Sequence, residues 1–483
     1  MIGLEFIVLI IWLATVVLSG IIPVILKPLR GREDYSVAER KVGWLRNYLT
    51  AHSTQLSGVQ FMGFPGVIYS LLGLAILPAH YIPYMIGTSA FWMIFVVKVW
   101  RIGKKYGFIT PTDIFKWYFG GGTLFTIFIS IIYIITILPY IQTQVGAAGQ
   151  IFSLASGGVI PLWLGALITY IAVTAYIWVG GFRAVTIVDT IQGLILLVSL
   201  WVGSLAIIIG FGGLGAFQKL PAQLTYVSGF AGYNWLLTST WAISYGAGWA
   251  FMPHLWINLY SPKNERVARL WPTTVYVENV LHGTVLTIAT VMVAAALPGI
   301  KPDLAFFAGV QKISQYIYAF VLAGVGAAIV TTVDAQLFVV GLLLSHDILE
   351  KGRKHFTDRQ FIWINRVLVG VVAIIGFLLY FIYPYPLGII AGYAAALGLI
   401  MAPPVILILT GQKWITKEGV VAGILAGLIS IIVFSSTPLT NLFGIHYSAW
   451  SVVIDSAVLI VTSLFTKSKP LSETVNEIKA AGW

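Results

Sequence analysis

Residues 245–254 read Tyr-Gly-Ala-Gly-Trp-Ala-Phe-Met-Pro-His and lie inside a long apolar run, about residues 234–259. Glycines and a proline in such a run predict a membrane-spanning helix that is interrupted. In lipid every backbone polar group must be hydrogen-bonded, so a broken helix persists only where it is buried in protein or lines a cavity. A second such stretch is residues 53–66, where Ser-Thr-Gln-Leu-Ser-Gly is followed by Gly-Phe-Pro-Gly. The two stretches predict a polar site inside a helical bundle.

Apolar runs recur along nearly the whole chain. Of its 483 residues, 59% are hydrophobic and 9% are charged, whereas soluble chains carry about 25% charged residues. The first run is too long for a cleaved leader, and we read it as a retained helix. Because a spanning helix needs about 20 apolar residues, we predict about thirteen spans in an all-α integral membrane protein. They lie near 3–26, 50–74, 82–99, 119–152, 159–179, 187–211, 234–259, 272–297, 314–345, 361–382, 386–410, 417–435 and 447–466.

Lysine and arginine gather in alternate loops. The basic segments are 27–46, 98–105, Arg183, 263–269, 351–359, 413–417 and 467–469, and the intervening loops are poor in these residues apart from Lys219 and Lys301. Cytoplasmic loops carry such an excess of positive charge. We therefore predict a multi-pass protein of the cell membrane, with its N-terminus outside and Trp483 in the cytoplasm. The net charge of +11 is read as this topology signal and not as a nucleic-acid-binding surface.

Several classes of site are missing from the sequence. The chain has no cysteine, which excludes disulfides, thiolate metal sites and iron–sulfur clusters. It has no Walker-type phosphate loop and no Gly-x-Ser-x-Gly elbow. We therefore expect neither an energised pump nor an enzyme, and no cofactor other than a coupling ion.

The two interrupted helices are five predicted spans apart. An odd separation reverses direction across the membrane, and broken helices at matching places in two inverted halves point to a transporter site. The alternative is that glycine and proline are simply common in membrane helices. On the first reading, a single transmembrane domain (1–483) comprises an extra N-terminal helix at 1–30, a first repeat at 45–212, a second repeat at 233–412, and two C-terminal helices with a cytoplasmic tail at 413–483.

Four polar residues inside predicted spans could bind an ion. Thr331 and Thr332 carry hydroxyls that can replace water around a cation, although such hydroxyls usually bond to the preceding helical turn. Asp189 offers a hard, charged oxygen, or it is an acid stabilised by a helix dipole. An acid such as Asp334 in a spanning helix is by default a functional residue, either a protonatable group, a cation ligand or the partner of a basic group.

Residues beside the two interruptions could bind a solute. Tyr245, Trp249 and Pro253 recur every four residues on one helix face, where aromatic rings can stack on a solute or simply pack. Gln55 and Gln60 flank the other interruption and could hydrogen-bond to it.

The eighth predicted span carries a polar stripe. Glu278 and His282 are one helical turn apart, with Asn279 between them. They could form a proton relay or a structural polar contact. Asp455 in the last span allows the same structural interpretation.

Residues 180–193 resemble the signature of the sodium:solute symporter family, whose usual form is Gly-Gly-x-x-Ala-Val-x-x-x-Asp-x-x-Gln. Four further segments resemble core helices of this family in the same order, over nearly the full chain. They are 57–66, 249–254, 331–337 together with 345–348, and 392–403.

The resemblance implies the inverted-repeat fold of LeuT-type transporters and an assignment of site residues. The cation site would comprise the backbone carbonyls of Ser53, Leu56 and Ala328 and the hydroxyls of Thr331 and Thr332, with Asp189 near the ion exit path. The solute site would comprise Gln55, Gln60, Tyr245, Trp249 and Pro253.

Segments 107–113, 138–144 and 252–254 are most similar to the monocarboxylate permease branch, with similarity to proline and pantothenate symporters elsewhere. The chain has Gln55 where proline symporters carry Asp, and Asp334 where a small Ser is common. The second difference leaves the coupling ion open between sodium and a proton. We expect a monomeric symporter that moves a monocarboxylate or amino acid into the cell with sodium by alternating access. The alternatives are proton coupling on the same fold, or a channel or sensor on this scaffold.

Overall fold

The computed structural model describes residues 3–225, 234–350, 355–382 and 387–482. Part of the predicted basic segment 351–359, residue 386 at the start of one predicted span, residue 233 at the start of the second repeat, and Trp483 lie outside these ranges. In the described ranges the chain is helical, apart from one isolated bridge between Val42 and Pro262.

The longer helices are α1 (Leu4–Leu26), α3 (Trp44–Gln55), α6 (Ile82–Tyr106), α8 (Thr123–Ala155), α9 (Leu162–Gly210), α12 (Trp235–Ala250), α14 (Glu265–Ala296), α16 (Gln315–Leu342), α17 (Asp358–Ile382), α18 (Leu387–Leu399), α20 (Lys417–Ser435) and α21 (Tyr447–Phe465). Shorter ones are α2 (Arg32–Val37), η1 (Ala38–Arg40), α4 (Gly58–Phe61), α5 (Gly63–Val67), η2 (Ile68–Leu72), η3 (Gly73–Ala75), η4 (Leu77–Tyr81), α7 (Thr112–Tyr118), α10 (Gly213–Phe217), α11 (Ala222–Thr225), α13 (Pro253–Tyr260), η5 (Pro302–Leu304), α15 (Ala305–Ile313), η6 (Leu343–Leu349), α19 (Ala402–Leu409), η8 (Pro438–Gly444) and α22 (Ser472–Ala480).

The described ranges contain a helical counterpart for each predicted span. Ten helices in the described ranges are long and apolar enough to cross a membrane. One of them, α9, contains two spans, because Gly181 has φ 55° and ψ −145° and breaks the helix. A side chain at Gly181 would also meet the Tyr35 ring at 2.5 Å. The two interrupted spans, α3–α5 and α12–α13, complete the set.

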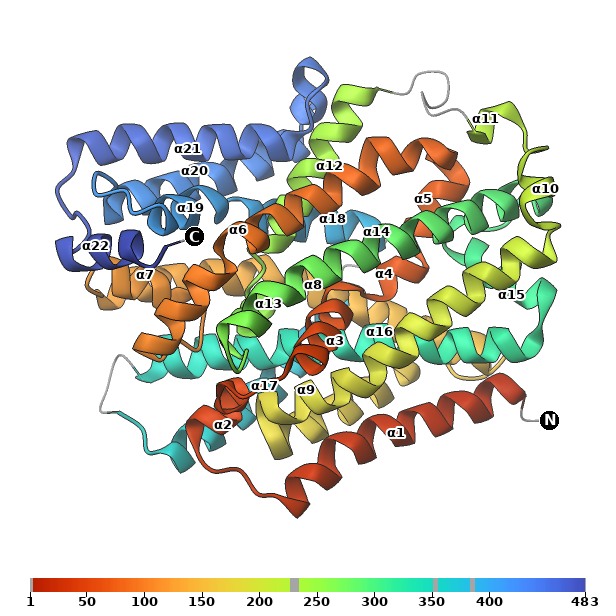
Figure 1. Ribbon diagram of the computed structural model, residues 1–483, viewed down its shortest axis with the longest axis horizontal. Helices are drawn as coiled ribbons and strands as arrows, with labels where there is room; N and C mark the ends of the chain where they lie inside the picture. The colour runs from red at the N-terminus through yellow and green to blue at the C-terminus, as the bar shows by residue number, and fades with distance from the viewer. Residues whose placement is uncertain (1–2, 226–233, 351–354, 383–386, 483) are drawn as a thin grey trace.

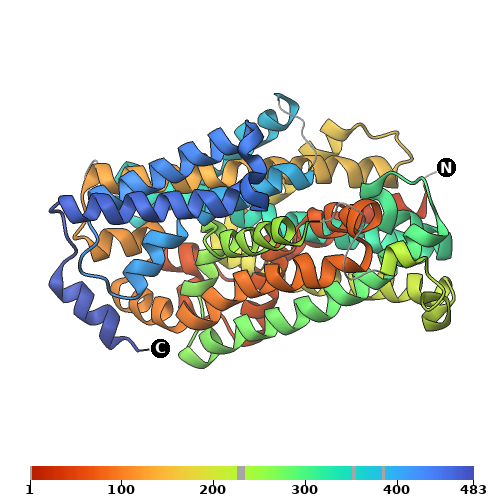
Figure 2. The ribbon, with the colours of Figure 1, turned by 90° about the horizontal axis from the view of Figure 1, so that it is seen from above.

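Helix α16 is the central element. Nearly all of its side chains are buried, and it packs against α1, α3, α8 and α9. By contrast only 28% of the most apolar part of α1, α17 and α21 is buried, as in lipid-facing helices. Helices α20 and α21 pack on each other and form one edge of the bundle (Figure 2).

The two ends of the bundle differ. Figure 1 shows α2, α7 and α22 on the left, and α10, α11 and the N-terminus on the right. The segment predicted as a cytoplasmic tail contains α22, which docks on α7 because Thr474 Oγ1 donates to the Tyr118 carbonyl at 3.0 Å. The tail is thus attached to the bundle.

Candidate functional site

The first broken helix ends in a turn rich in hydrogen-bond acceptors. Helix α3 stops at Gln55, and Leu56 leaves it with φ −90° and ψ 103°. Ser57 then caps α4, its Oγ accepting from the Val59 N–H at 3.1 Å. The last carbonyls of α3 have no partner within the helix, and they carry the negative end of its dipole. This turn therefore favours a cation.

The threonine pair of α16 faces that turn. Thr331 Oγ1 lies 3.1 Å from the Ser53 carbonyl and 2.8 Å from the Ala327 carbonyl one turn back, and Thr332 Oγ1 lies 3.5 Å from the Thr54 carbonyl. Thr332 Oγ1 also bonds to the Ala328 carbonyl, one turn back, at 2.8 Å. Both threonines are fully buried. The structure thus brings the predicted hydroxyls to the end of α3, beside the point where Leu56 leaves the helix, while they keep the backbone bonds usual for threonine.

Two carboxyl groups lie one turn beyond the threonine pair. Asp334 on α16 accepts from the Tyr176 hydroxyl at 2.5 Å. Asp189 on α9 interacts electrostatically with Asp334 and with Arg46. Both acids are fully buried. Two neighbouring buried carboxylates repel each other when both are ionised, so either one of them binds a proton or a cation compensates the pair.

The second broken helix is interrupted within the predicted stretch 245–254, in its last third. Helix α12 continues through both glycines to Ala250, and Met252 is extended with φ −66° and ψ 129° before α13 begins. The glycines serve close packing instead. A Cβ at Gly246 or Gly248 would lie 2.0 Å from a carbonyl oxygen of the neighbouring helix, that of Tyr84 or Ala395 respectively.

Indole groups satisfy the backbone at this second break. The Ala250 carbonyl, at the end of α12, accepts from the indole N–H of Trp256 at 3.2 Å and from that of Trp92 at 3.4 Å. Both indoles are buried. The free carbonyl therefore already has donors and does not need an ion.

A cavity of about 450 Å³ lies between the two broken helices. Gln55, Gln60, Tyr245 and Trp249 line it, whereas Pro253 is not in its wall because it begins α13 beyond the break. The wall also holds aromatic residues that sequence reasoning did not select, since Trp and Tyr are abundant throughout the chain. They include Phe64, His80, Tyr81, Tyr84, Tyr140, Trp241, Tyr393, His446 and Tyr447.

Charge in the cavity wall is sparse. None of the described lining residues is Lys or Arg, and the one carboxylate among them is Asp303 of η5. Burial raises the pKa of Asp303, and nearby Lys301 opposes that shift. Because Asp303 of η5 is part of the wall, the cavity extends from the breaks toward the end of the bundle that carries η5.

Helix α14 holds the two glutamines. Asn279 Nδ2 donates to Gln55 Oε1 at 3.2 Å, and Gln60 Nε2 lies 3.2 Å from His282 Nε2. The polar stripe seen in the sequence thus lies behind the cavity wall. Its contact with the glutamines crosses between helices and has no signature in the linear sequence.

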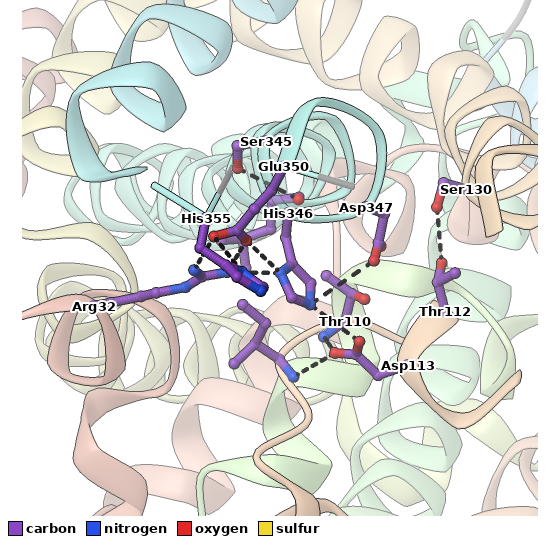
Figure 3. Close-up of polar contacts among 12 residues, drawn as sticks. Arg32, Thr110, Thr112, Asp113, Ser130, Ser345, His346, Asp347, Glu350 and His355 are labelled. Atoms are coloured by element: carbon purple, nitrogen blue, oxygen red, sulfur yellow. Dashed lines mark hydrogen bonds and ion pairs between the residues drawn. The ribbon is translucent and has the colours of Figure 1, made fainter. Parts of the chain in front are cut away.

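An ion-pair network links segments at the other end of the bundle (Figure 3). Arg32 of α2 binds Glu350 through two hydrogen bonds of 2.7 and 2.6 Å, and His346 Nε2 lies 3.0 Å from Asp113 Oδ1 on α7. Burial would raise the pKa of Asp113, but His346 and two backbone N–H groups lower it below its usual value. Asp113 therefore stays ionised at neutral pH, and the network holds α2, α7 and the end of η6 together.

The sequence model of the sodium:solute symporter family matches residues 35–427. The chain belongs to the sodium:solute symporter family. It is therefore a multi-pass membrane transporter that couples a small solute to sodium, and it is not an enzyme.

Individual relatives agree with this assignment. The chain is 26% identical over 460 residues to a sodium/proline symporter of Staphylococcus aureus (strain bovine RF122 / ET3-1), covering 90% of this chain and 87% of the relative. Among solved structures, it resembles a Na+-coupled sialic acid symporter in a substrate-bound outward-open state, with a TM-score of 0.77, 15% identity, and coverage of 97% and 99%. It also resembles Mhp1, a nucleobase-cation-symport-1 family transporter, with a TM-score of 0.63, 14% identity, and coverage of 94% and 99%. These structures confirm the predicted LeuT-type fold.

Proposed function

We propose that this symporter moves a small organic solute of the amino-acid or monocarboxylate class into the cell with sodium, by alternating access. The observation that carries the proposal is the 3.1 Å contact between Thr331 Oγ1 and the Ser53 carbonyl at the end of α3. Hydroxyls and half-helix carbonyls of this kind coordinate sodium in broken-helix transporters. Leu56 and Ala328 supply the remaining carbonyls of the proposed cation site.

The cavity wall favours a zwitterionic amino acid over a bare anion. It offers Asp303, and none of its described lining residues is a Lys or Arg that would neutralise a carboxylate. A cation bound by neutral oxygens keeps its charge and attracts the carboxylate of the solute. The ammonium group then faces aromatic rings such as Tyr245 and Trp249, which attract cations. A sodium/proline symporter among the relatives agrees with this class. Because some segments are similar to monocarboxylate permeases, lactate-type solutes are also candidates.

Coupling follows from the position of the glutamines. Gln55 is the last residue of α3, and Gln60 lies in α4, just past the break. A cation that fixes the end of α3 therefore fixes both amides for the solute. By linkage, the solute raises cation affinity by the same factor as the cation raises solute affinity.

The test is uptake into liposomes that contain the purified protein. L-proline, other neutral amino acids, lactate and pyruvate are offered under a sodium gradient or a proton gradient alone. We expect uptake of a neutral amino acid that requires sodium. Uptake of none of these solutes, or uptake that ignores both gradients, would refute the proposal.

Proton coupling is the second candidate. It is favoured by the adjoining buried carboxyl groups of Asp189 and Asp334, which can share one proton. In the same assay, uptake driven by a proton gradient without sodium would select this alternative.

The orientation and repeat boundaries are part of the proposal. The proposed repeats are 45–212 and 233–412, and they lie between the helix at 1–30 and the segment 413–483. The one-sided Lys and Arg loops then place the N-terminus outside and the C-terminus in the cytoplasm. The exposed residues Lys41 and Lys219 provide two single-cysteine sites in this cysteine-free chain. In right-side-out vesicles an impermeant thiol reagent should label Lys219→Cys and spare Lys41→Cys, and the reverse would invert the topology.

A further inference from the structure

A buried carboxylate with two histidines lies behind the cavity wall. Glu278 Oε2 accepts from His52 Nε2 on α3 and from His282 Nδ1, at 2.9 Å, on its own helix α14. Glu278 Oε1 accepts from the indole N–H of Trp201 on α9 at 3.3 Å. Both histidines are fully buried, and α3 and α14 pack side by side (Figure 1).

All of these contacts are made together when Glu278 is ionised and both histidines are neutral. A neutral histidine donates from one ring nitrogen and accepts at the other. Since both histidines donate to Glu278, the free Nε2 of His282 is an acceptor, and Gln60 Nε2 donates to it at 3.2 Å. The Tyr81 hydroxyl, 3.3 Å from the same nitrogen, donates to the Asn279 carbonyl at 2.7 Å.

The cluster then carries one negative charge inside the membrane. An intramembrane charge without a counter-ion is costly. The groups that face the cluster from neighbouring elements are Tyr48 on α3, Tyr81 on η4, Trp201 on α9 and Gln60 on α4. Only the two tyrosines among them can titrate, and neither supplies a positive charge. None of these neighbouring groups therefore compensates the charge of Glu278.

We propose that His282 is a proton-binding site, separate from the sodium site, whose protonation reverses the hydrogen-bonding polarity of Gln60 in the solute cavity. A proton on His282 Nε2 turns that nitrogen into a donor, so the Gln60 amide must rotate to present its oxygen to it. The Gln60 NH₂ group then faces the cavity in place of its oxygen.

The consequence for the solute rests on the proposed amino-acid class. A solute ammonium that donates a hydrogen bond to Gln60 Oε1 loses this acceptor when His282 is protonated. It also meets the added positive charge of the His282 ring. Solute affinity at saturating sodium should therefore fall as pH decreases, by about tenfold.

The proton site can be tested without a solute. Purified protein labelled with ¹⁵N-histidine in lipid bilayers is followed by solid-state NMR from pH 5 to 8.5, and His282→Gln assigns the signal. We expect a neutral ring with its proton on Nδ1 at high pH and a doubly protonated ring at low pH. A His282 signal that stays in one form over this range would overturn the proposal. Asp455→Asn, a buried acid on the distant α21, should leave the titration unchanged.

The polarity of Gln60 is tested by binding. L-proline binding at saturating sodium is measured at pH 5.5 and pH 8 for the wild type, His282→Gln and Gln60→Leu. We expect the pH dependence of the wild type to be absent from His282→Gln and strongly reduced in Gln60→Leu, where only the added charge of His282 acts. An undiminished pH dependence in either variant would overturn the link to Gln60. Glu278→Gln serves as a second variant if His282→Gln fails to fold. Loss of sodium-dependent binding at every pH would instead count against the proposed function, so the two failures are distinguishable.

Discussion

The two broken helices meet the same backbone problem in different ways. At the end of α3 the freed carbonyls of Ser53 and Thr54 face the hydroxyls of Thr331 and Thr332, which can donate a hydrogen bond or coordinate a cation. At the end of α12 the freed carbonyl of Ala250 accepts from two indole N–H groups, which can only donate. Matching breaks therefore need not be matching ion sites, since the side chain opposite the carbonyl decides which break can bind sodium.

The largest effect should follow from removing a hydroxyl at the first break. Thr331→Val keeps the shape of the side chain and loses the oxygen, so sodium affinity should fall about tenfold to a hundredfold. Solute affinity at low sodium should fall with it. Sodium-dependent solute binding to the purified protein measures both.

Thr290→Val is the matched control for this change. Thr290 is equally buried, and its hydroxyl bonds to the Leu286 carbonyl at 2.8 Å within α14, away from either break. The sodium affinity of the Thr290→Val variant should equal that of the wild type. Equal losses in the two variants would mean that Thr331 acts through the helix and not as a ligand.

Removing the aromatic face beside the second break should change solute affinity alone. Trp249 lines the cavity one residue before the end of α12, and its ring contacts that of Tyr140 with centroids 4.4 Å apart. Trp249→Ala should weaken solute binding about tenfold, while sodium affinity measured without solute stays unchanged. A large loss of sodium affinity in this variant would erase the distinction between the breaks.

Sequence reasoning located the first break closely and the second approximately. The glycines and proline of 245–254 predict an interruption without saying which residue makes it: Gly246 and Gly248 allow close approach to Tyr84 and Ala395, which depends on the position of another helix. The spans were predictable because membrane thickness sets their length. The pairing of Asn279 with Gln55, and that of Arg32 with Glu350, could not be predicted, since each joins distant segments through a single pair of residues.

A smaller effect is expected from the indole donors at the second break. Trp256→Phe keeps an aromatic ring and removes the N–H that bonds to the Ala250 carbonyl at 3.2 Å. The free energy of unfolding should fall by about 1 kcal/mol, visible as a lower thermal midpoint, because Trp92 still offers one donor. Sodium affinity should not change, and a change would show that this break also takes part in ion binding.

The smallest effect is expected from Asp334→Asn, which tests whether the ion at the first break is sodium. Asparagine retains an oxygen that can accept from the Tyr176 hydroxyl, now 2.5 Å from Asp334, and it removes one of two adjoining buried acids. If sodium alone drives transport, the Thr331 and Thr332 hydroxyls carry the coupling, and uptake under a sodium gradient should stay close to that of the wild type. If a proton shared by Asp189 and Asp334 drives transport, uptake under a gradient should be lost while solute exchange persists, because exchange needs binding but no net proton movement. Measuring uptake and exchange in the same liposomes separates these outcomes, and loss of uptake with intact exchange would move the coupling site from the broken end of α3 to the carboxyl pair one turn away.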